Sequence, residues 1–390
     1  MSARRPLRIA VLGDFDSIHT QRWLRAFVER GHEVHAVSFY HPRSELLGVN
    51  LHVLRSGGAS APGEEYTPAP SRLRQALRSP LRLLHGGRYL RAGLRQKVRE
   101  IAPDVFHAHY LVEFGFYGSL VGYRPYAVSA WGSDVYREPR KPISHLVARW
   151  TIRRAQLVTG SDPAMVAALR GLGARKRQTQ LVRIGALEEP FFEPNPVSVN
   201  EGPAETPPTV LSTRALEPLY NIDMVLRAFA GVRADLPQAR LQIAGEGSER
   251  AALEALASEL GLGESVSFFG RLTPEQMRDA LSAAHVYVSV PSSDSLAAST
   301  MEAMARGAFP VVSDLPSLDG FIEHDVTGLR VAVHDVEALA SGLRRALTDA
   351  DLRRNAMPLN RHKVEAEGRL AKQVEKLEAA FYALVDEKRS

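Results

Sequence analysis

Short apolar runs alternate with longer segments of mixed polarity along almost the whole chain. Several runs are apolar at every position rather than at every second one, which is typical of parallel strands buried on both faces. The segments between them have the length of helices, so the pattern predicts βαβ units and an α/β fold. The predicted strands are residues 8–12, 33–39, 51–54, 104–108, 126–130, 157–160, 181–184, 210–213, 241–244, 265–269, 286–290 and 309–312. The predicted helices include residues 20–30, 224–234, 248–260, 336–347 and 364–387.

One stretch interrupts this alternation. Residues 188–208 contain six prolines and no periodic apolar face, which is typical of an extended linker between domains. The boundary predicts two doubly wound parallel-sheet domains of similar size, at residues 1–187 and about 209–370. A chain of 390 residues is long enough for two domains of this kind.

The segment with the richest candidate chemistry is residues 291–314, which combines a strand end, a polar loop, a predicted helix and another strand. If the helix starts near Leu296, Asp294 lies in the loop before it and Glu302 lies almost two turns inside. The backbone amides of residues 297–299 would then be first-turn donors without an intrahelical partner, and such donors bind anions. The alternative is that Asp294 is an N-cap and Glu302 a surface residue.

Other candidate groups also follow predicted strands, where ligands bind in open α/β sheets. Arg214 comes directly after one strand, in position for its guanidinium to reach a phosphate. The segment 245–247 reads Gly-Glu-Gly and predicts a tight turn. The first strand-to-helix junction, residues 12–23, lacks the GxGxxG fingerprint of dinucleotide-binding domains, so an enzyme that uses a nicotinamide cofactor is not favoured.

Two histidines, His107 and His109, are spaced to share one side of a strand. We expect their segment and residues 129–136 to reach the cleft between the domains. A pair of histidines can ligate a metal, but no acidic partner stands at a recognised metal-binding spacing. We therefore expect no metal site.

Composition removes several classes of protein. The chain has no cysteine, which excludes disulfide scaffolds, zinc sites with Cys ligands, iron–sulfur clusters and thiol nucleophiles. No run of 18 apolar residues occurs, so we expect no membrane-spanning helix. The short apolar run after the N-terminus is not a signal peptide, and we expect a cytoplasmic protein.

Charge is distributed unevenly. Cations outnumber acids in residues 1–200, whereas acids outnumber cations in residues 201–390. Residues 71–99 hold nine cations and no acid, interleaved with leucines. Two interpretations stay open: a basic amphipathic element that lies on an anionic membrane, or a solvated arginine-rich face. No nucleic-acid-binding motif accompanies the patch, so we do not expect a nucleic acid as partner.

The motifs described above, taken in their order along the chain, resemble those of glycosyltransferase family 4. Members of this family are retaining enzymes that have the GT-B fold and use nucleotide sugars. The family's Glu-x7-Glu signature has its counterpart in Asp294 and Glu302, followed by Ala-Met-Ala-x-Gly at 303–307 and Pro-Val-Val at 310–312. The resemblance covers nearly the whole chain. It implies two Rossmann-like domains that face a central cleft, the first binding the acceptor and the second the donor. It also implies that the C-terminal helix, about residues 371–390, packs back on the first domain.

The resemblance assigns roles residue by residue. Asp294 contacts the donor sugar, Glu302 holds the ribose and Arg214 neutralises the leaving diphosphate. The donor-binding positions are Gly13, Arg214, Tyr220, Glu246, Phe269, Asp294, Ala298, Ser299, Thr300 and Glu302. The acceptor-binding positions are His19, His109, Trp131 and Asp134. The expected catalytic residues are Asp294, Arg214 and His109.

Three positions depart from the family. The first acid of the signature is Asp294 instead of the usual Glu. Tyr220 stands where the family usually has a lysine after the arginine, and Trp131 stands where many members have a cleft histidine.

We expect front-face retaining transfer from a UDP- or GDP-sugar to a glycan, lipid-linked or small-molecule acceptor, without a metal or other cofactor. Under the membrane interpretation of residues 71–99, an anionic membrane contacted at its inner face is a further partner; under the other interpretation it is not. The alternatives are a catalytically silent relative that binds a nucleotide sugar or glycan, and another GT-B enzyme such as a nucleotide-sugar epimerase or phosphorylase.

Overall fold

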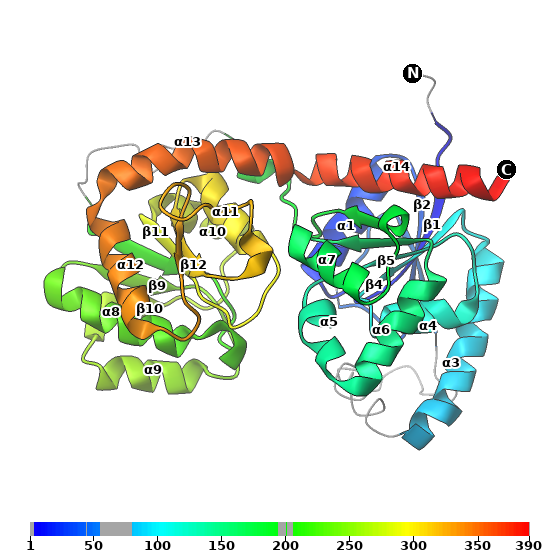
Figure 1. Cartoon of the computed structure of the whole chain (residues 1–390), viewed down its shortest axis with the longest axis horizontal. Helices are drawn as coiled ribbons and strands as arrows, with labels where there is room; N and C mark the ends of the chain where they lie inside the picture. Colours follow the sequence, from blue (N-terminus) through cyan, green and yellow to red (C-terminus); the bar gives the residue numbers. More distant parts are fainter. Residues whose placement is uncertain (1–3, 44, 55–79, 194–199, 201–205, 390) are drawn as a thin grey trace. The chain divides into compact units, whose positions relative to one another are not determined.

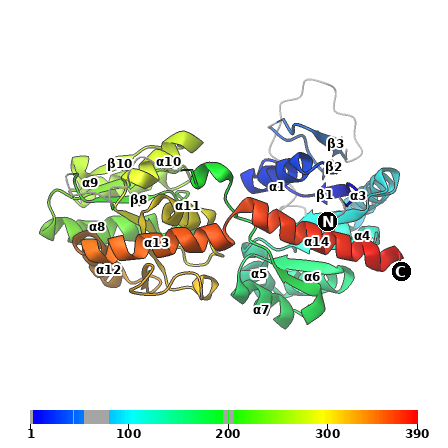
Figure 2. The same cartoon turned by 90° about the horizontal axis from the view of Figure 1, so that it is seen from above.

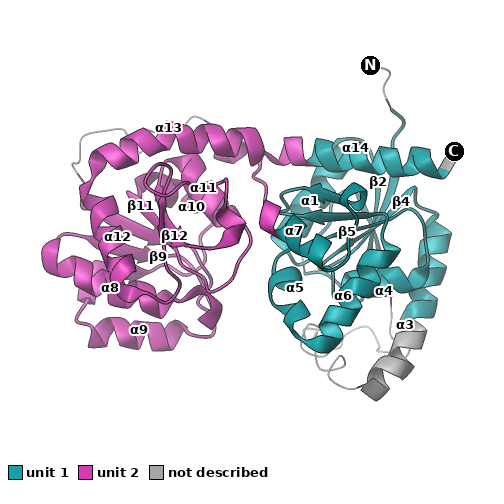
Figure 3. Ribbon diagram, viewed as in Figure 1, with its two compact units in different colours: residues 1–161, 165–184, 374–390 teal, residues 162–164, 185–373 magenta. Residues whose placement is uncertain are grey.

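A computed structural model describes residues 4–43, 45–54, 80–193, 200 and 206–389. The chain forms two compact units (Figure 3). Unit 1 comprises residues 1–161, 165–184 and 374–390, and unit 2 comprises residues 162–164 and 185–373. Apart from the three residues 162–164, the chain passes from unit 1 to unit 2 at residues 184–185, slightly before the predicted linker, and returns to unit 1 at 373–374. Most of the predicted linker, residues 194–199 and 201–205, lies outside the described residues.

Unit 1 is built on a seven-stranded parallel sheet with α1 on one face and α3, α4 and α6 on the other (Figures 1 and 2). The strands, in spatial order, are β3 (Val49–Val53), β2 (Glu33–Ser38), β1 (Arg8–Leu12), β4 (Val105–His109), β5 (Tyr126–Ser129), β6 (Leu157–Gly160) and β7 (Thr179–Leu181). The helices are α1 (Ile18–Glu29), α3 (Pro80–Ile101), α4 (Phe114–Val121), α5 (Ser133–Tyr136), α6 (Pro142–Arg154) and α7 (Pro163–Gly171).

Apolar residues on both faces of this sheet explain its stability. Phe106 and Val128 belong to a core that includes Leu94 and Val98 of α3. On the opposite face, Phe27 of α1 packs against Phe381 of the C-terminal helix α14 (Leu370–Arg389), with ring centroids 6.0 Å apart. The part of α14 from residue 374 onward thus completes unit 1.

The described part of the basic stretch corrects one expectation. Leu94 is buried in the unit 1 core, as are Val98 and Ile101. The apolar side of the last turns of α3 therefore packs against the sheet, and Leu94 does not form part of a membrane-facing stripe. The exposed side carries Arg91, Arg95 and Arg99. Residues 71–79 lie outside the described residues. Among the helices of the described residues, none is both long and apolar enough to cross a membrane.

Unit 2 is built on a six-stranded parallel sheet with helices on both faces. The strands, in spatial order, are β10 (Val266–Phe268), β9 (Arg240–Ile243), β8 (Thr209–Ser212), β11 (Val286–Ser289), β12 (Phe309–Ser313) and β13 (Leu329–Val331). The helices are α8 (Ile222–Asp235), α9 (Arg250–Glu259), α10 (Pro274–Ala283), α11 (Ala298–Arg306), α12 (Val336–Thr348) and α13 (Ala350–Glu367).

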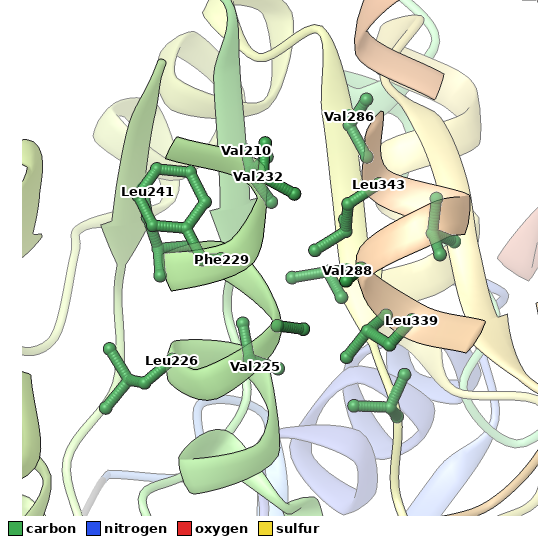
Figure 4. Close-up of a cluster of buried hydrophobic side chains, with 14 of the residues drawn as sticks. Val210, Val225, Leu226, Phe229, Val232, Leu241, Val286, Val288, Leu339 and Leu343 are labelled. Carbon is green, nitrogen blue, oxygen red and sulfur yellow. The ribbon is translucent and has the colours of Figure 1, made fainter. Parts of the chain in front are cut away.

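Alternate residues of β11 point to opposite faces of the sheet and pack in two different hydrophobic cores. Val286 and Val288 of β11 point toward α8 and α12 (Figure 4), where they join Phe229 and Leu343. Tyr287, between the two valines, belongs to a second core with residues of α10 and α11. A strand buried on both faces has to be apolar throughout, which is the pattern seen in the sequence.

The expected fold class is confirmed: the chain has two Rossmann-like, doubly wound parallel-sheet units. Three element predictions were wrong. The predicted helix 364–387 is two helices, because the Gly368 carbonyl accepts a bond from the Leu187 amide and interrupts the helix. The strand predicted at 181–184 is β7, which pairs with β6 through the more polar residues 179–181. Strand β13 was missed because its sequence, Leu-Arg-Val, has a charged residue at its centre and forms no apolar run.

Candidate functional site

Helix α11 follows the loop after β11 and begins at Ala298, two residues later than predicted. Ala297 is its N-cap and offers no side-chain acceptor, so the amides of the first turn are not capped by that residue. Gly307 ends the helix in the left-handed conformation, with φ of 90°. The aligned peptide dipoles make the start of such a helix favourable for negative charge.

Arg214 lies at this end of α11, just after β8. Its Nη2 is 2.5 Å from Oδ2 of Asp294, and its Nη1 donates a hydrogen bond to Ser299 Oγ over 3.1 Å. Strands β8 and β11 are neighbours in the sheet, so the loops after their carboxyl ends meet. The structure thereby brings together three of the predicted donor residues.

The Arg214 guanidinium is only 8% exposed but remains charged. Burial alone would lower its pKa, but the Asp294 carboxylate and the Tyr287 and Tyr220 side chains outweigh burial, so the pKa is raised. The Tyr220 ring lies beneath the guanidinium, 4.2 Å from ring centroid to Cζ. Tyr220 therefore holds the arginine by a cation–π contact instead of adding a second cation. The buried Nε of Arg214 has no hydrogen-bond partner among the described residues.

Tyr287 is a residue of this site that the sequence analysis missed. Its hydroxyl donates to Ser299 Oγ over 2.8 Å, and Thr213 Oγ1 donates to that hydroxyl over 3.4 Å. A chain of side chains thus runs from Thr213 to Arg214 through Tyr287 and Ser299. The available signal was a single tyrosine within the valine-rich strand β11, where a buried hydroxyl needs a partner. The Ser299 side chain was not expected to take part either, since the sequence indicated only its backbone amide.

Glu246 and Phe269 lie on neighbouring loops of unit 2. Gly245 packs so closely that a Cβ there would lie 2.2 Å from the Arg214 carbonyl oxygen, which places the Glu246 loop against the Arg214 loop. The Glu246 carboxylate is 2.6 Å from Arg250 and faces Gly270, whose φ is +72°. Phe269 is 48% exposed. These residues form an open rim on the side of the site away from α11.

Glu302 is half-buried on the second turn of α11, and Thr300 is buried in its first turn. Asp294, Ala297 and Thr300 also line a small hollow together with Ser313 and Leu318. A separate hollow of about 850 Å³ lies between residues 319–327 and α13 and contains no predicted donor residue.

A second cluster of predicted residues lies in unit 1, around His109. This side chain is 2% exposed, its Nδ1 is 3.3 Å from Thr20 Oγ1, and its Nε2 has no partner within the described ranges. A Cβ at Gly13 would lie 3.2 Å from His109 Cβ, so the glycine leaves room for the imidazole. Burial lowers the pKa of His109 to about 3, and the ring is neutral at physiological pH.

Trp131 and His19 complete this cluster. The Trp131 ring lies 5.4 Å from the His109 ring and 6.0 Å from the His19 ring, measured between centroids. Burial and the nearby Arg22 lower the pKa of His19 to about 4. The cluster therefore presents neutral donors and an aromatic surface, which suits an uncharged polar group such as a sugar hydroxyl.

Asp134 has a different role from the expected acceptor contact. Its carboxylate is fully buried and accepts hydrogen bonds from the amides of Leu111, Trp131 and Gly132, at 2.6, 2.9 and 2.8 Å. Burial raises the pKa of Asp134 although these hydrogen bonds oppose the rise. With no exposed atom, the carboxylate has no access to an acceptor and instead holds the backbone at Trp131.

Both histidines lie within β4, and His107 does not reach the surface. His107 is fully buried between Ser129 and Phe381, with Nε2 2.8 Å from Ser129 Oγ. Its ring lies 4.7 Å from that of His109, so the predicted shared side is correct. In the described part of the chain, no three His, Asp or Glu side chains are grouped so as to hold a metal ion.

Two doubly wound parallel-sheet units in one chain are typical of GT-B proteins. Residues 197–362 match the family described as Glycosyl transferases group 1, and residues 8–162 match the family described as Glycosyl transferase 4-like. The chain belongs to the glycosyltransferases of this family 4 type. The resemblance seen in the sequence is thus confirmed.

Individual relatives agree with this assignment. The chain is 22% identical over 300 residues to the N-acetyl-alpha-D-glucosaminyl L-malate synthase of Bacillus anthracis, which covers 74% of this chain and 78% of that protein. Among solved structures, sucrose-phosphate synthase from Thermosynechococcus elongatus superposes with a TM-score of 0.77 at 19% identity, over 97% of this chain and 100% of the other. The Anabaena protein HepE, in complex with UDP and glucose, gives 0.75 at 15% identity with the same coverage. These structural likenesses show the shared fold.

Proposed function

We propose that this glycosyltransferase moves a sugar from a UDP- or GDP-sugar to a hydroxyl acceptor with retention of configuration. The observation that carries the proposal is the cluster of Arg214, Asp294 and Ser299 at the start of α11. A buried guanidinium beside first-turn amides matches the charge and geometry of a diphosphate. The complex of HepE with UDP and glucose supports a uridine donor.

Each donor residue has a proposed task. Arg214 and the amides of Ala298 and Ser299 bind the diphosphate, and Glu302 on the next turn holds the ribose. Asp294, together with the rim residues Glu246 and Phe269, would contact the sugar and the base. Gly13 of unit 1 would let the chain approach the donor closely.

The proposed reaction follows from this placement of charge. The bond between the sugar C1 and the phosphate oxygen breaks while the acceptor oxygen bonds to C1 on the same face. The acceptor proton passes to the departing phosphate oxygen. Negative charge grows on the diphosphate, and a preorganised cation and amides at that position stabilise it. Because Arg214 supplies this charge, we propose a reaction that needs no metal or other cofactor.

We propose that the acceptor binds at the unit 1 cluster of His19, His109 and Trp131. Neutral His109 can donate or accept a hydrogen bond but does not carry a charge to the acceptor. The acceptor classes are a glycan, a lipid-linked molecule or a small hydroxyl compound, the last supported by the name of the Bacillus anthracis relative. For a lipid-linked acceptor, we propose a cytoplasmic enzyme that is peripheral to the inner face of the membrane.

The test combines binding with turnover. UDP, GDP and their sugars are screened for a rise in the melting temperature, since a ligand that binds the native state stabilises it. The donor that binds is then incubated with candidate acceptors. Free nucleotide and a new α-linked or β-linked glycoside that keeps the donor's anomeric configuration are the expected products. An isomerised donor sugar indicates an epimerase, and binding without turnover across acceptor classes indicates a silent relative.

A further inference from the structure

Helix α6 of unit 1 leaves three large apolar side chains exposed. Ile143, Leu146 and Trp150 are 76%, 67% and 42% exposed. They stand at positions i, i+3 and i+7 and therefore share one face of the helix. The opposite face is used by the fold, since Ala148 and Ile152 are buried in the unit 1 core.

Cations surround this apolar face. Arg137, Arg140, Lys141, Arg153 and Arg154 are exposed, and Arg149 is half-buried. Glu138 is the single acid in residues 137–154, and it lies 3.5 Å from Lys141. We refer to the three apolar residues and these six cations as the α6 face.

The Trp150 ring is held in an interfacial arrangement. Its Nε1 donates to Ser119 Oγ of α4 over 3.1 Å, while the guanidinium of Arg154 stacks on the ring at 4.4 Å from the centroid. The ring is therefore fixed at its polar end and open to the surroundings on its apolar part. Tryptophan and arginine side chains with this division are typical of the boundary between water and lipid headgroups.

Further exposed cations lie on α3, on the same side of the unit 1 sheet as α6. Helix α4 packs against both α6 and α3, and the three helices cover the same face of the unit 1 sheet (Figure 1). Helix α3 presents Arg91, Arg95 and Arg99 outward. We propose that the α6 face, with these arginines of α3, docks unit 1 on an anionic lipid bilayer.

Charge and area together favour a bilayer over other occupants. A second copy of the chain would bring the same cations together and repel. A protein partner in a stable complex buries about 800 Å² on each side, which three apolar side chains do not supply. A bilayer needs less apolar area, because anionic headgroups attract every cation within about a Debye length.

This proposal rests on the membrane association included in the proposed function and names the surface that makes the contact, but its test does not need turnover. A transferase held on a membrane would meet a lipid-linked acceptor at the surface. Lipid binding is measured without any glycosyl donor, so its outcome and that of the turnover assay are separate. A rise in melting temperature with UDP reports the donor site alone.

The experiment is co-sedimentation of the full chain with vesicles of phosphatidylcholine, with and without phosphatidylglycerol, at low and high salt. We expect binding that requires phosphatidylglycerol and weakens with salt. The double variant Ile143→Ser/Leu146→Ser should bind about tenfold more weakly for each side chain removed. Leu359→Ser, which removes a 49% exposed leucine on α13 of unit 2, is the matched control and should bind like wild type.

Tryptophan fluorescence provides a second readout. Emission should shift to the blue on anionic vesicles, and Trp150→Phe should remove the shift. Vesicle binding by wild type that Ile143→Ser/Leu146→Ser leaves unchanged would overturn the proposal, as would the absence of binding to either vesicle. Loss of binding only when Arg74, Arg78 and Arg82 become Glu, with α6 variants unaffected, would assign the contact to residues 71–99 instead. Unchanged melting temperatures show that the variants are folded.

Discussion

Arg214 and Asp294 are 80 positions apart in the chain, and their side chains form an ion pair of 2.5 Å between Nη2 and Oδ2. The two residues come from loops after neighbouring strands, β8 and β11. The resemblance implied that Arg214 binds the diphosphate and that Asp294 contacts the sugar. It did not imply an ion pair between the two side chains. A diphosphate at this position would share the guanidinium with Asp294.

The first prediction concerns the two acids of the signature. Glu302→Ala should weaken the binding of nucleotide diphosphate and nucleotide sugar equally, by about 1.5–3 kcal/mol, the usual scale for a charged hydrogen bond. Asp294→Ala should weaken only the nucleotide sugar, because the Arg214 guanidinium released from the ion pair still binds the diphosphate. Isothermal titration with UDP and with UDP-glucose, or the guanosine pair, measures both. Equal losses for both ligands in both variants contradict the assignment.

The second prediction concerns the charge on the leaving group. Arg214→Ala should lower kcat by about 10²–10³-fold, the scale seen when a group that stabilises developing charge is removed. Arg214→Lys should recover only part of the rate, because an ammonium lacks the fork that reaches Asp294 and Ser299 together. Wild-type turnover should survive excess chelator. Activity that chelator abolishes and magnesium or manganese restores contradicts the proposal.

The third prediction concerns Tyr287. Tyr287→Phe removes the hydroxyl that donates to Ser299 and should reduce donor affinity or kcat by about 3- to 10-fold, equivalent to one neutral hydrogen bond. Tyr126→Phe is the matched control, because that buried hydroxyl bonds to the Gly115 carbonyl in unit 1. Both variants should lose similar stability, but only Tyr287→Phe should alter donor kinetics. The same kinetic loss in Tyr126→Phe would indicate a general effect of destabilisation.

The local pattern of apolar residues was sufficient to predict most strands of the two sheets, because strands buried on both faces must be apolar throughout. It was also sufficient to place Arg214 and Asp294 in loops after strand ends and Glu302 in the helix that follows Asp294. It did not reveal the Arg214–Asp294 pair or the contact from Tyr287 to Ser299. The Arg214–Asp294 pair depends on β8 and β11 being neighbours in the sheet, and sequence order does not show this because β9 and β10 lie between them in the chain. The contact from Tyr287 to Ser299 depends on how α11 packs against the strand that precedes it, which the pattern of apolar residues does not specify.

Burial explains the other differences. Asp134 has the residue type of an acceptor ligand, but three backbone amides surround its carboxylate. Leu94 belongs to the leucines interleaved with cations that suggested an amphipathic membrane helix, but its side chain packs in the unit 1 core. The break at Gly368 arises from pairing with Leu187, which is distant in sequence. The outcomes at Leu94 and Gly368 depend on contacts between segments that are separated in sequence, whereas the burial of Asp134 combines two nearby amides, those of Trp131 and Gly132, with the distant amide of Leu111.

The fourth prediction concerns the pH dependence of unit 1 stability. Burial lowers the pKa of His109 to about 3 and that of His19 to about 4, against an ordinary value of 6.5. The unfolded chain therefore binds more protons than the native unit between about pH 6.5 and 4. Native stability is retained above pH 6.5 and falls as the pH drops through this window, by up to about 1.4 kcal/mol per pH unit for each histidine.

The three tryptophans, Trp23, Trp131 and Trp150, all lie in unit 1, so their fluorescence follows the unfolding of that unit by urea. In His109→Asn, the free energy of unfolding should depend less steeply on pH in this window than it does in wild type. The carboxylates contribute equally to both proteins, so the difference between the two slopes reports the histidine. His285→Asn is the matched control. Burial lowers the pKa of this unit 2 histidine to about 4 as well, and its loss should leave the tryptophan-detected transition unchanged. An unchanged slope in His109→Asn would mean that the histidine is protonated in the native unit, and the neutral acceptor-side imidazole of the proposed function would then be wrong.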